Sequence, residues 1–112
     1  MATLVVPKSA LRILEMTLDI VTIRANANGE LFGGEIADAM GEAGNQLGIN
    51  RLEVLLVRTV LVRTMESLGE NYPSEVLQNH ETRMRVSDAI KYLRQAIELT
   101  GRLQNAAEEV AI

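Results

Sequence analysis

The segment from Pro7 to Ala27 carries two apolar faces rather than one. At 3.6 residues per helical turn, one face holds Leu11, Leu14, Leu18, Val21 and Ala25, and the nearly opposite face holds Ile13, Met16, Ile20, Ile23 and Ala27. A helix at the edge of a small bundle needs only one apolar face. Because a chain of 112 residues has few other helices to cover the second face, we expect a partner chain to cover it, most simply a second copy.

The composition favours helix-on-helix packing. The chain is 47% hydrophobic but only 3% aromatic, so Leu, Ile, Val, Met and Ala must build the core, and few rings are present to stack on a planar cofactor. There is no Cys, and His80 is the only histidine, so a typical zinc site is not expected. We therefore predict no cofactor and no metal.

The charge and the hydropathy pattern restrict the partners. The net charge of -4 opposes non-specific binding to nucleic acid and to anionic membranes. No run of about 18 uncharged apolar residues occurs, so we expect no membrane span. The absence of cysteine and of an N-terminal secretion signal agrees with a cytoplasmic location, which we adopt as the expectation.

Breaks in the sequence divide the chain into three shorter helices and one long one. Asn28-Gly29, Gly33-Gly34, and Gly48 with Asn50 interrupt it, because these residues tolerate backbone angles that end helices. We expect helices over residues 7–27, 35–47, 51–68 and 74–112. The β-branched residues in 16–24 and 52–62 would also suit strands, but no companion segments are present to build a sheet.

The last 39 residues, 74–112, contain no Pro and a single Gly. Their apolar residues recur at near-heptad spacing, which is typical of a coiled coil. An uninterrupted helix would extend ~58 Å at 1.5 Å per residue, so it either projects from its domain or breaks. Ser87-Asp88 resembles an internal N-cap and is the first candidate for a break or kink, and Gly101 is the second. The fold prediction is an all-α, oligomeric bundle, a single helical domain over 1–112.

A row of small residues follows the second expected helix. It consists of Ala37, Gly41, Gly44 and Gly48. Each interior glycine costs a helix roughly 1 kcal/mol relative to alanine, so the row needs a reason. One interpretation is close packing of a neighbouring helix, and the other is a weak helix that frays near Gly44.

Arginines interrupt the most apolar part of the third expected helix. Arg51 and Arg58 are seven positions apart and share a face, and Arg63 follows them. Arginine suits ion pairs with planar carboxylates, and the acids of the second helix, in the same chain or in a partner, are plausible mates. Alternatively, the arginines extend over the rim of the core with their charges in water.

A helix-turn-helix DNA-binding regulator is the first functional alternative. The residues Ile36-Ala37, followed after two positions by Met40-Gly41, look like the opening helix of that motif. However, four acids and no Lys or Arg occur between Glu30 and Asn50. Such a surface repels phosphate groups, so nucleic acid is not the favoured partner.

The second alternative comes from a local resemblance. The run from Asn26 to Gly34 resembles the loop before the central helix of hot-dog-fold acyl-CoA thioesterases. Its sequence is NANGELFGG. The resemblance implies an acidic catalytic residue on that helix, where this chain has Gly41 with Glu42 next to it. It also implies a long sheet wrapped around the helix, whereas the last 39 residues are predicted to be helical.

The favoured hypothesis is a non-enzymatic, self-assembling interaction or adaptor module with no catalytic residue. We expect a homo-oligomer, with a dimer favoured, and a further protein partner could bind through the C-terminal helix. The predicted oligomer interface consists of apolar side chains from the first and third helices: Ile13, Met16, Ile20, Ile23, Leu55, Leu56 and Val62.

Overall fold

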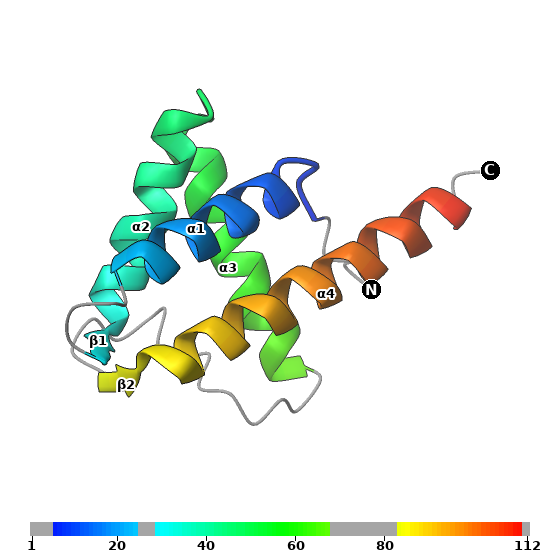
Figure 1. Cartoon of the computed structure of the whole chain (residues 1–112). Helices are drawn as coiled ribbons and strands as arrows, with labels where there is room; N and C mark the ends of the chain where they lie inside the picture. The colour runs from blue at the N-terminus through cyan, green and yellow to red at the C-terminus, as the bar shows by residue number, and fades with distance from the viewer. Residues whose placement is uncertain (1–5, 25–28, 68–82, 111–112) are drawn as a thin grey trace.

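The computed structural model describes residues 6–24, 29–67 and 83–110 of the chain. Within these residues the chain forms four helices and two short strands (Figure 1). In chain order they are α1 (Ala10–Arg24), β1 (Glu30–Phe32), α2 (Gly33–Gln46), α3 (Arg51–Ser67), β2 (Arg83–Arg85) and α4 (Val86–Val110). The predominantly helical architecture is confirmed, and residues 16–24 and 52–62 are helical rather than extended. The two strands were not predicted.

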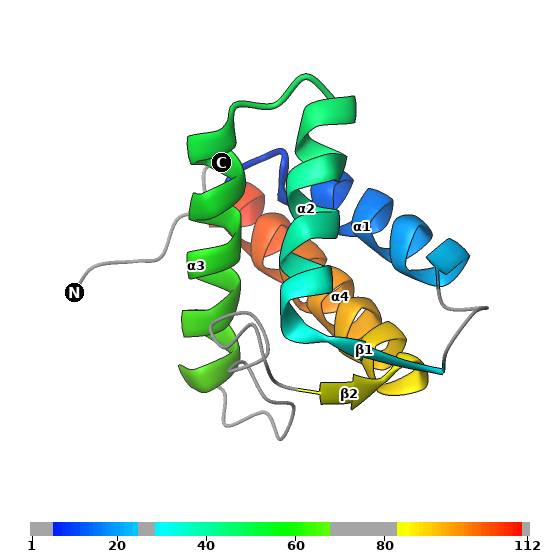
Figure 2. The same ribbon diagram turned by 90° about the vertical axis from the view of Figure 1, so that its left-hand side faces the viewer.

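The two strands form a small antiparallel sheet that joins distant parts of the chain (Figure 2). Leu31 lies opposite Met84 in the register, and both side chains are buried. The Val86 N–H donates to the Gly29 carbonyl at 3.0 Å and extends the pairing by one bond. Gly29 has a φ of 68°, a left-handed conformation that glycine adopts without steric cost. The sheet therefore fixes the start of α2 beside the start of α4.

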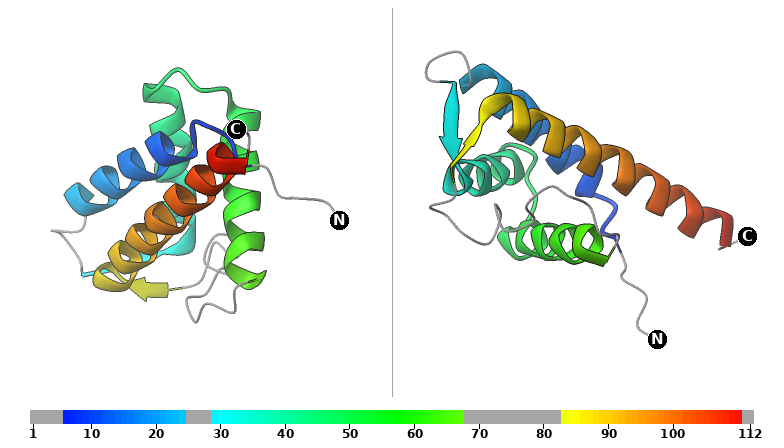
Figure 3. Two further views of the ribbon diagram at one scale, coloured as in Figure 1. Left: turned by 90° about the vertical axis from the view of Figure 1, so that its right-hand side faces the viewer. Right: turned by 90° about the horizontal axis from the view of Figure 1, so that it is seen from below.

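The prediction of one helix over 74–112 is wrong. Residues 83–85 form a strand, and α4 begins at Val86, immediately after it, while residues 74–82 lie outside the described part. Ser87 lies in the first turn of α4, so this helix begins within one residue of the break predicted at Ser87-Asp88. With 25 residues, α4 is about 37 Å long at 1.5 Å per residue, and its C-terminal end extends beyond the other helices (Figure 3).

The core forms around α1. This helix has its most extensive contacts with α4 and with α2, and the two helices cover it from different sides (Figures 1 and 3). The largest fully buried side chains are Tyr92, Ile13, Leu14, Ile36, Met40, Leu93 and Thr17. The Thr17 hydroxyl donates to the Ile13 carbonyl at 2.6 Å, which satisfies this buried polar group within its own helix.

A tight turn joins α2 to α3, and the two helices lie side by side (Figure 2). Gly48 ends α2 with a φ of 69°, and the Ile49 N–H donates to the Gly44 carbonyl at 2.8 Å. This is the usual way in which a left-handed glycine terminates a helix. Asn50 then caps α3, because its Oδ1 accepts a hydrogen bond from the Leu52 N–H at 2.8 Å.

The described residues do not form the hot-dog architecture that the local resemblance implied. The described residues contain one sheet with two strands of three residues each. The helix that follows Gly33-Gly34 packs against α1 and α3 rather than inside a long sheet. The thioesterase alternative therefore loses the fold on which its acyl-CoA site depended.

Candidate functional site

The second apolar face of α1 does not form an open surface. Ile13 is fully buried and Ile20 is 9% exposed within the single chain, and Met16 packs, partly buried, against the same core. Only Ile23 at the end of α1 is open, with 75% of its surface exposed. The argument that one chain cannot cover both faces of this helix is therefore wrong, and Ile13 and Ile20 are core residues. The self-association that it suggested stays a prediction.

The exposed apolar surface lies on α3 instead. Leu52 is 73% exposed, Leu56 is 50% exposed and Leu55 is 39% exposed. These three residues, which we call the leucine face, lie within one turn of each other on the first half of the helix, as positions three and four apart do. Val62, which was predicted to join them, is buried. The sequence predicted Leu55 and Leu56 as interface residues but missed Leu52.

The position of α3 in the bundle explains this exposure. The helix lies at the outside of the bundle with α2 as its neighbour (Figures 2 and 3). Its other side buries Val54, Val57 and Leu61 in the core. The side of α3 that faces the core is therefore buried, and the leucine face points away from the core with no cover among the described residues.

A groove of about 780 Å³ runs between α2 and α3, beside the leucine face. The α2 wall carries Asp38 and Glu42, and the α3 wall carries Arg51 and Arg58. In the part of the chain that the structure describes, Asp38 and these two arginines make no ion pair with one another. Asp38 thus shares one groove with Arg51 and Arg58 without an ion pair to either of them in the described residues.

The row of small residues divides into three kinds of position. Gly44 is buried, and a Cβ there would overlap the Val54 side chain, so α3 approaches α2 closely at this point. Gly41 and Ala37 line the groove, and a Cβ on Gly41 would meet nothing within 4 Å. Gly48 serves the turn. The helix continues to Gln46, so it does not fray at Gly44.

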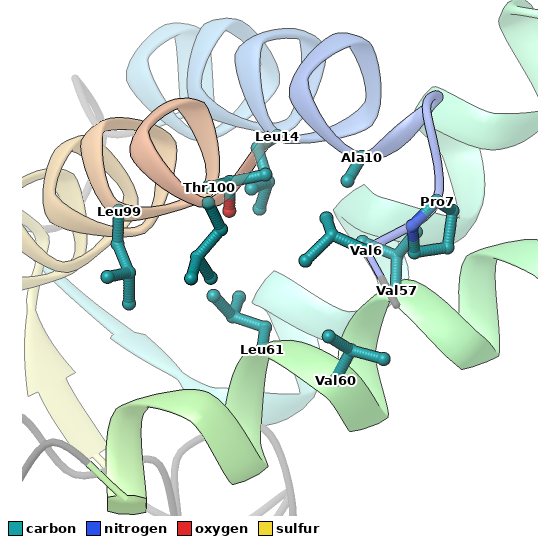
Figure 4. A pocket seen from close by; sticks show the side chains of 10 residues that line it. Val6, Pro7, Ala10, Leu14, Val57, Val60, Leu61, Leu99 and Thr100 are labelled. Atoms are coloured by element: carbon teal, nitrogen blue, oxygen red, sulfur yellow. The ribbon is translucent and has the colours of Figure 1, made fainter. Parts of the chain in front are cut away.

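A second, much smaller cavity lies between α1, α3 and α4 (Figure 4). Its volume is about 10 Å³, which is room for about one water molecule. The side chains around it are apolar except for the Thr100 hydroxyl: Val6, Pro7, Ala10, Leu14, Val57, Val60, Leu61, Leu99 and Leu103. We interpret it as a packing gap in the core.

The titratable groups assemble no metal site in the described residues. No group of three or more His, Asp or Glu side chains there is placed to hold an ion, and His80 lies outside the described part. Burial raises the pKa of the Tyr92 phenol above its ordinary value, so this side chain stays neutral in the core.

None of the described helices combines the length and the apolar character needed to cross a membrane.

The charge of the open surface bears on the helix-turn-helix alternative. Two helices joined by a short turn are present. The exposed start of α3 presents leucines beside Arg51, and the adjoining wall of α2 presents acids. DNA-reading helices instead present basic and polar side chains. DNA binding remains a prediction without support from this surface.

Comparisons with known proteins identify no family for this chain. No protein-family model, characterised protein or solved structure matches this chain.

Proposed function

We propose that this protein is a non-enzymatic, self-associating interaction module whose contact surface is the leucine face of α3. The observation that carries the proposal is the exposure of Leu52, Leu55 and Leu56 on one side of one helix. Fully burying a leucine side chain contributes roughly 1.5–3 kcal/mol. Three leucines grouped on the outermost helix therefore favour association more than leucines scattered over the surface would.

A second copy is the favoured partner. Most soluble oligomers are symmetric assemblies of one chain, and dimers are the commonest. A helix that presents apolar residues three and four positions apart can pack against another such helix, ridge into groove. Self-association needs no component other than this chain, so it is also the most direct form of the proposal to test.

Sedimentation of the purified chain over a range of concentrations tests this. We expect a dimer with a dissociation constant in the micromolar range or tighter, as is usual for specific interfaces. The double variant L52E/L56E should be a monomer at every concentration. I23E is the control, because it places one glutamate at an exposed isoleucine on α1, away from the leucine face, and it should dimerise like the original chain. A monomeric original chain, or a dimeric L52E/L56E variant, would contradict the proposal.

The projecting end of α4 supports a second candidate role, that of an adaptor. This end extends beyond the other helices (Figure 3), and Leu103 on it is 36% exposed. The Gln104 side chain donates to the Pro7 carbonyl at 2.9 Å, so the segment before α1 is tied to the same end. L103E should leave the dimer unchanged if α3 forms the contact. Loss of the dimer in L103E would move the contact surface to α4.

A further inference from the structure

The leucine face is the first half of a longer exposed stripe on α3. Four exposed residues follow one another along this stripe at intervals of four, three and four positions: Leu52, Leu56, Thr59 and Arg63. This spacing keeps the four residues on one side of the helix, and it is the repeat with which two helices pack along their length. The stripe is apolar in its first half and ends in a positive charge.

The threonine in this stripe is suited to a contact despite its hydroxyl group. The Thr59 Oγ1 donates to the Leu55 carbonyl at 2.9 Å, so the hydroxyl already has a hydrogen bond within its own helix. Covering a hydroxyl that is bonded in this way leaves no unsatisfied donor. A leucine of a partner can therefore pack on Thr59 and extend the apolar contact beyond Leu56.

The charges at the two ends of the stripe are opposite in sign. Glu53 follows Leu52 at one end and is partly exposed, and Arg63 is exposed at the other end. These two charged residues lie ten positions apart, about 15 Å along the helix, so they do not meet within one chain. Within the described residues, neither of them forms an ion pair. Both charges are therefore available to a partner that brings the opposite charge to each end.

We propose that α3 packs against α3 of a second copy in an antiparallel dimer, in which Arg63 of each copy pairs with Glu53 of the other. The two-fold axis passes between Leu56 and Thr59, so that each Leu56 contacts the Thr59 of the other copy. Each Leu52 then lies against the aliphatic part of the other copy's Arg63, whose charged end extends to the rim. The inference rests on the proposed self-association and adds its orientation and its ion pairs.

The charges decide between the two orientations that a helix pair can take. Parallel packing would set Arg63 against Arg63 of the other copy, and like charges across an interface oppose association. Antiparallel packing brings the positive end of each stripe to the negative end of the other, and the two-fold axis repeats the attraction. Arg51 and Arg58 line the groove between α2 and α3, so they lie to the side of the stripe.

Charge reversal with mixing tests the ion pairs. In its own homodimer, R63E places two glutamates together at each end of the contact, and E53R places two arginines there. Each variant should dimerise about tenfold more weakly than the original chain, because like charges then meet twice in one interface. An equal mixture of the two variants should form a heterodimer of near-original affinity, since every contact then joins opposite charges. Native mass spectrometry identifies the heterodimer by its mass.

The chain with both substitutions, E53R/R63E, is the matched control. Its charges are exchanged between the two ends of the stripe, so it should recover the homodimer. Circular dichroism of the three variants shows whether each keeps the helical content of the original chain. Two single variants that are folded and keep the original affinity would mean that these charges do not meet, and the arrangement would be wrong.

A disulfide cross-link tests the orientation without changing the charge pairs of the original chain. The chain has no cysteine, so an introduced thiol is the only one in its chain. In the antiparallel dimer, position 52 of one copy lies opposite position 63 of the other. A mixture of L52C and R63C should therefore form a disulfide-linked heterodimer on oxidation, which intact mass measurement identifies.

Each cysteine variant alone supplies the control for this cross-link. The same position in two antiparallel copies is displaced by eleven residues along the helices, about 16 Å, whereas a disulfide needs Cα atoms within about 7 Å. L52C alone should therefore stay uncross-linked. A cross-linked L52C homodimer would show parallel packing and would overturn the arrangement.

These experiments separate the inference from the proposal beneath it. A dimeric original chain that ignores both charge reversals, or that cross-links through L52C alone, would overturn the antiparallel arrangement and leave self-association standing. A monomeric original chain would overturn both.

Discussion

Helices α1 and α3 share one feature of sequence, an apolar surface that is wider than one face, but they lie in different environments. Both have apolar residues over more than one face. In α1, the neighbours α2 and α4 cover both faces, so that Ile13 and Leu14, adjacent in the chain, are both fully buried. In α3, only one side is covered, and Leu52 and Leu56 remain open. The comparison shows that excess apolar surface predicts a need for cover, while the position of a helix in the bundle decides which chain provides it.

The largest expected effect distinguishes two isoleucines of α1. Ile13 is fully buried and Ile23 is 75% exposed. I13A should lower the free energy of unfolding by about 2–5 kcal/mol, because it removes buried methyl groups and leaves a cavity. I23A should change it by no more than about 0.5 kcal/mol. Urea denaturation of both variants at one protein concentration measures the difference.

Similar losses in these two variants would mean that the end of α1 is covered as well. In that case α1 would supply part of an interface after all, and the contrast with α3 would disappear.

The next largest effect concerns the contact between α2 and α3. In G44A the new methyl group would overlap the Val54 side chain, and overpacking of this kind costs about 1–3 kcal/mol. The helix gains about 1 kcal/mol when alanine replaces glycine, so we expect a net loss of up to about 2 kcal/mol. G41A faces open space and should raise the free energy of unfolding by about 1 kcal/mol.

Thermal unfolding of the two glycine variants shows whether their effects have opposite signs. An increase in stability for both variants would mean that the Val54 side chain can move away from position 44. The packing of α3 against α2 would then be looser than the structure indicates.

Local signals were enough to predict much of the helical framework. The start of α3 at Arg51 was predicted from Gly48 and Asn50, and these residues form the turn and the cap. Such signals act over a few neighbouring positions, so they can be read from the sequence. The separation of α2 from α3 was predicted for the same reason.

Features that depend on distant segments were missed. β1 and β2 have three residues each, which is too short to show an alternating pattern, and their pairing joins Leu31 to Met84, which are separated by about half of the chain. α4 starts at Val86, directly after the paired strand ends at Arg85. The sequence predicted a break at Ser87-Asp88, but it did not predict that a strand precedes this break.

The candidate site was predicted only in part, because the cover of each helix face also depends on distant segments. Leu55 and Leu56 were named as interface residues and are exposed, whereas Ile20 and Val62 were named with them and are buried. Helical periodicity shows which residues share a face, but it does not show which face a neighbouring helix covers. Leu52 shares this apolar surface of α3 and was not named, because the sequence does not show which of its leucines a neighbouring helix leaves exposed.

The smallest expected effect compares how the two helices begin. The Asn50 side chain caps α3 through its bond to the Leu52 N–H. In contrast, the buried Ser9 hydroxyl before α1 makes no hydrogen bond within the described residues, and backbone bonds of 3.0 Å to the Pro7 and Ser9 carbonyls start this helix. N50A should therefore lower the free energy of unfolding by about 1 kcal/mol, and N50D should retain most of the cap.

S9A is the matched control, and it should change stability little, because it removes a hydroxyl that has no bond to lose. Chemical denaturation of the three variants gives the order N50A, then N50D, then S9A, from most to least destabilised. Equal losses for N50A and S9A would contradict this contrast between α3 and α1.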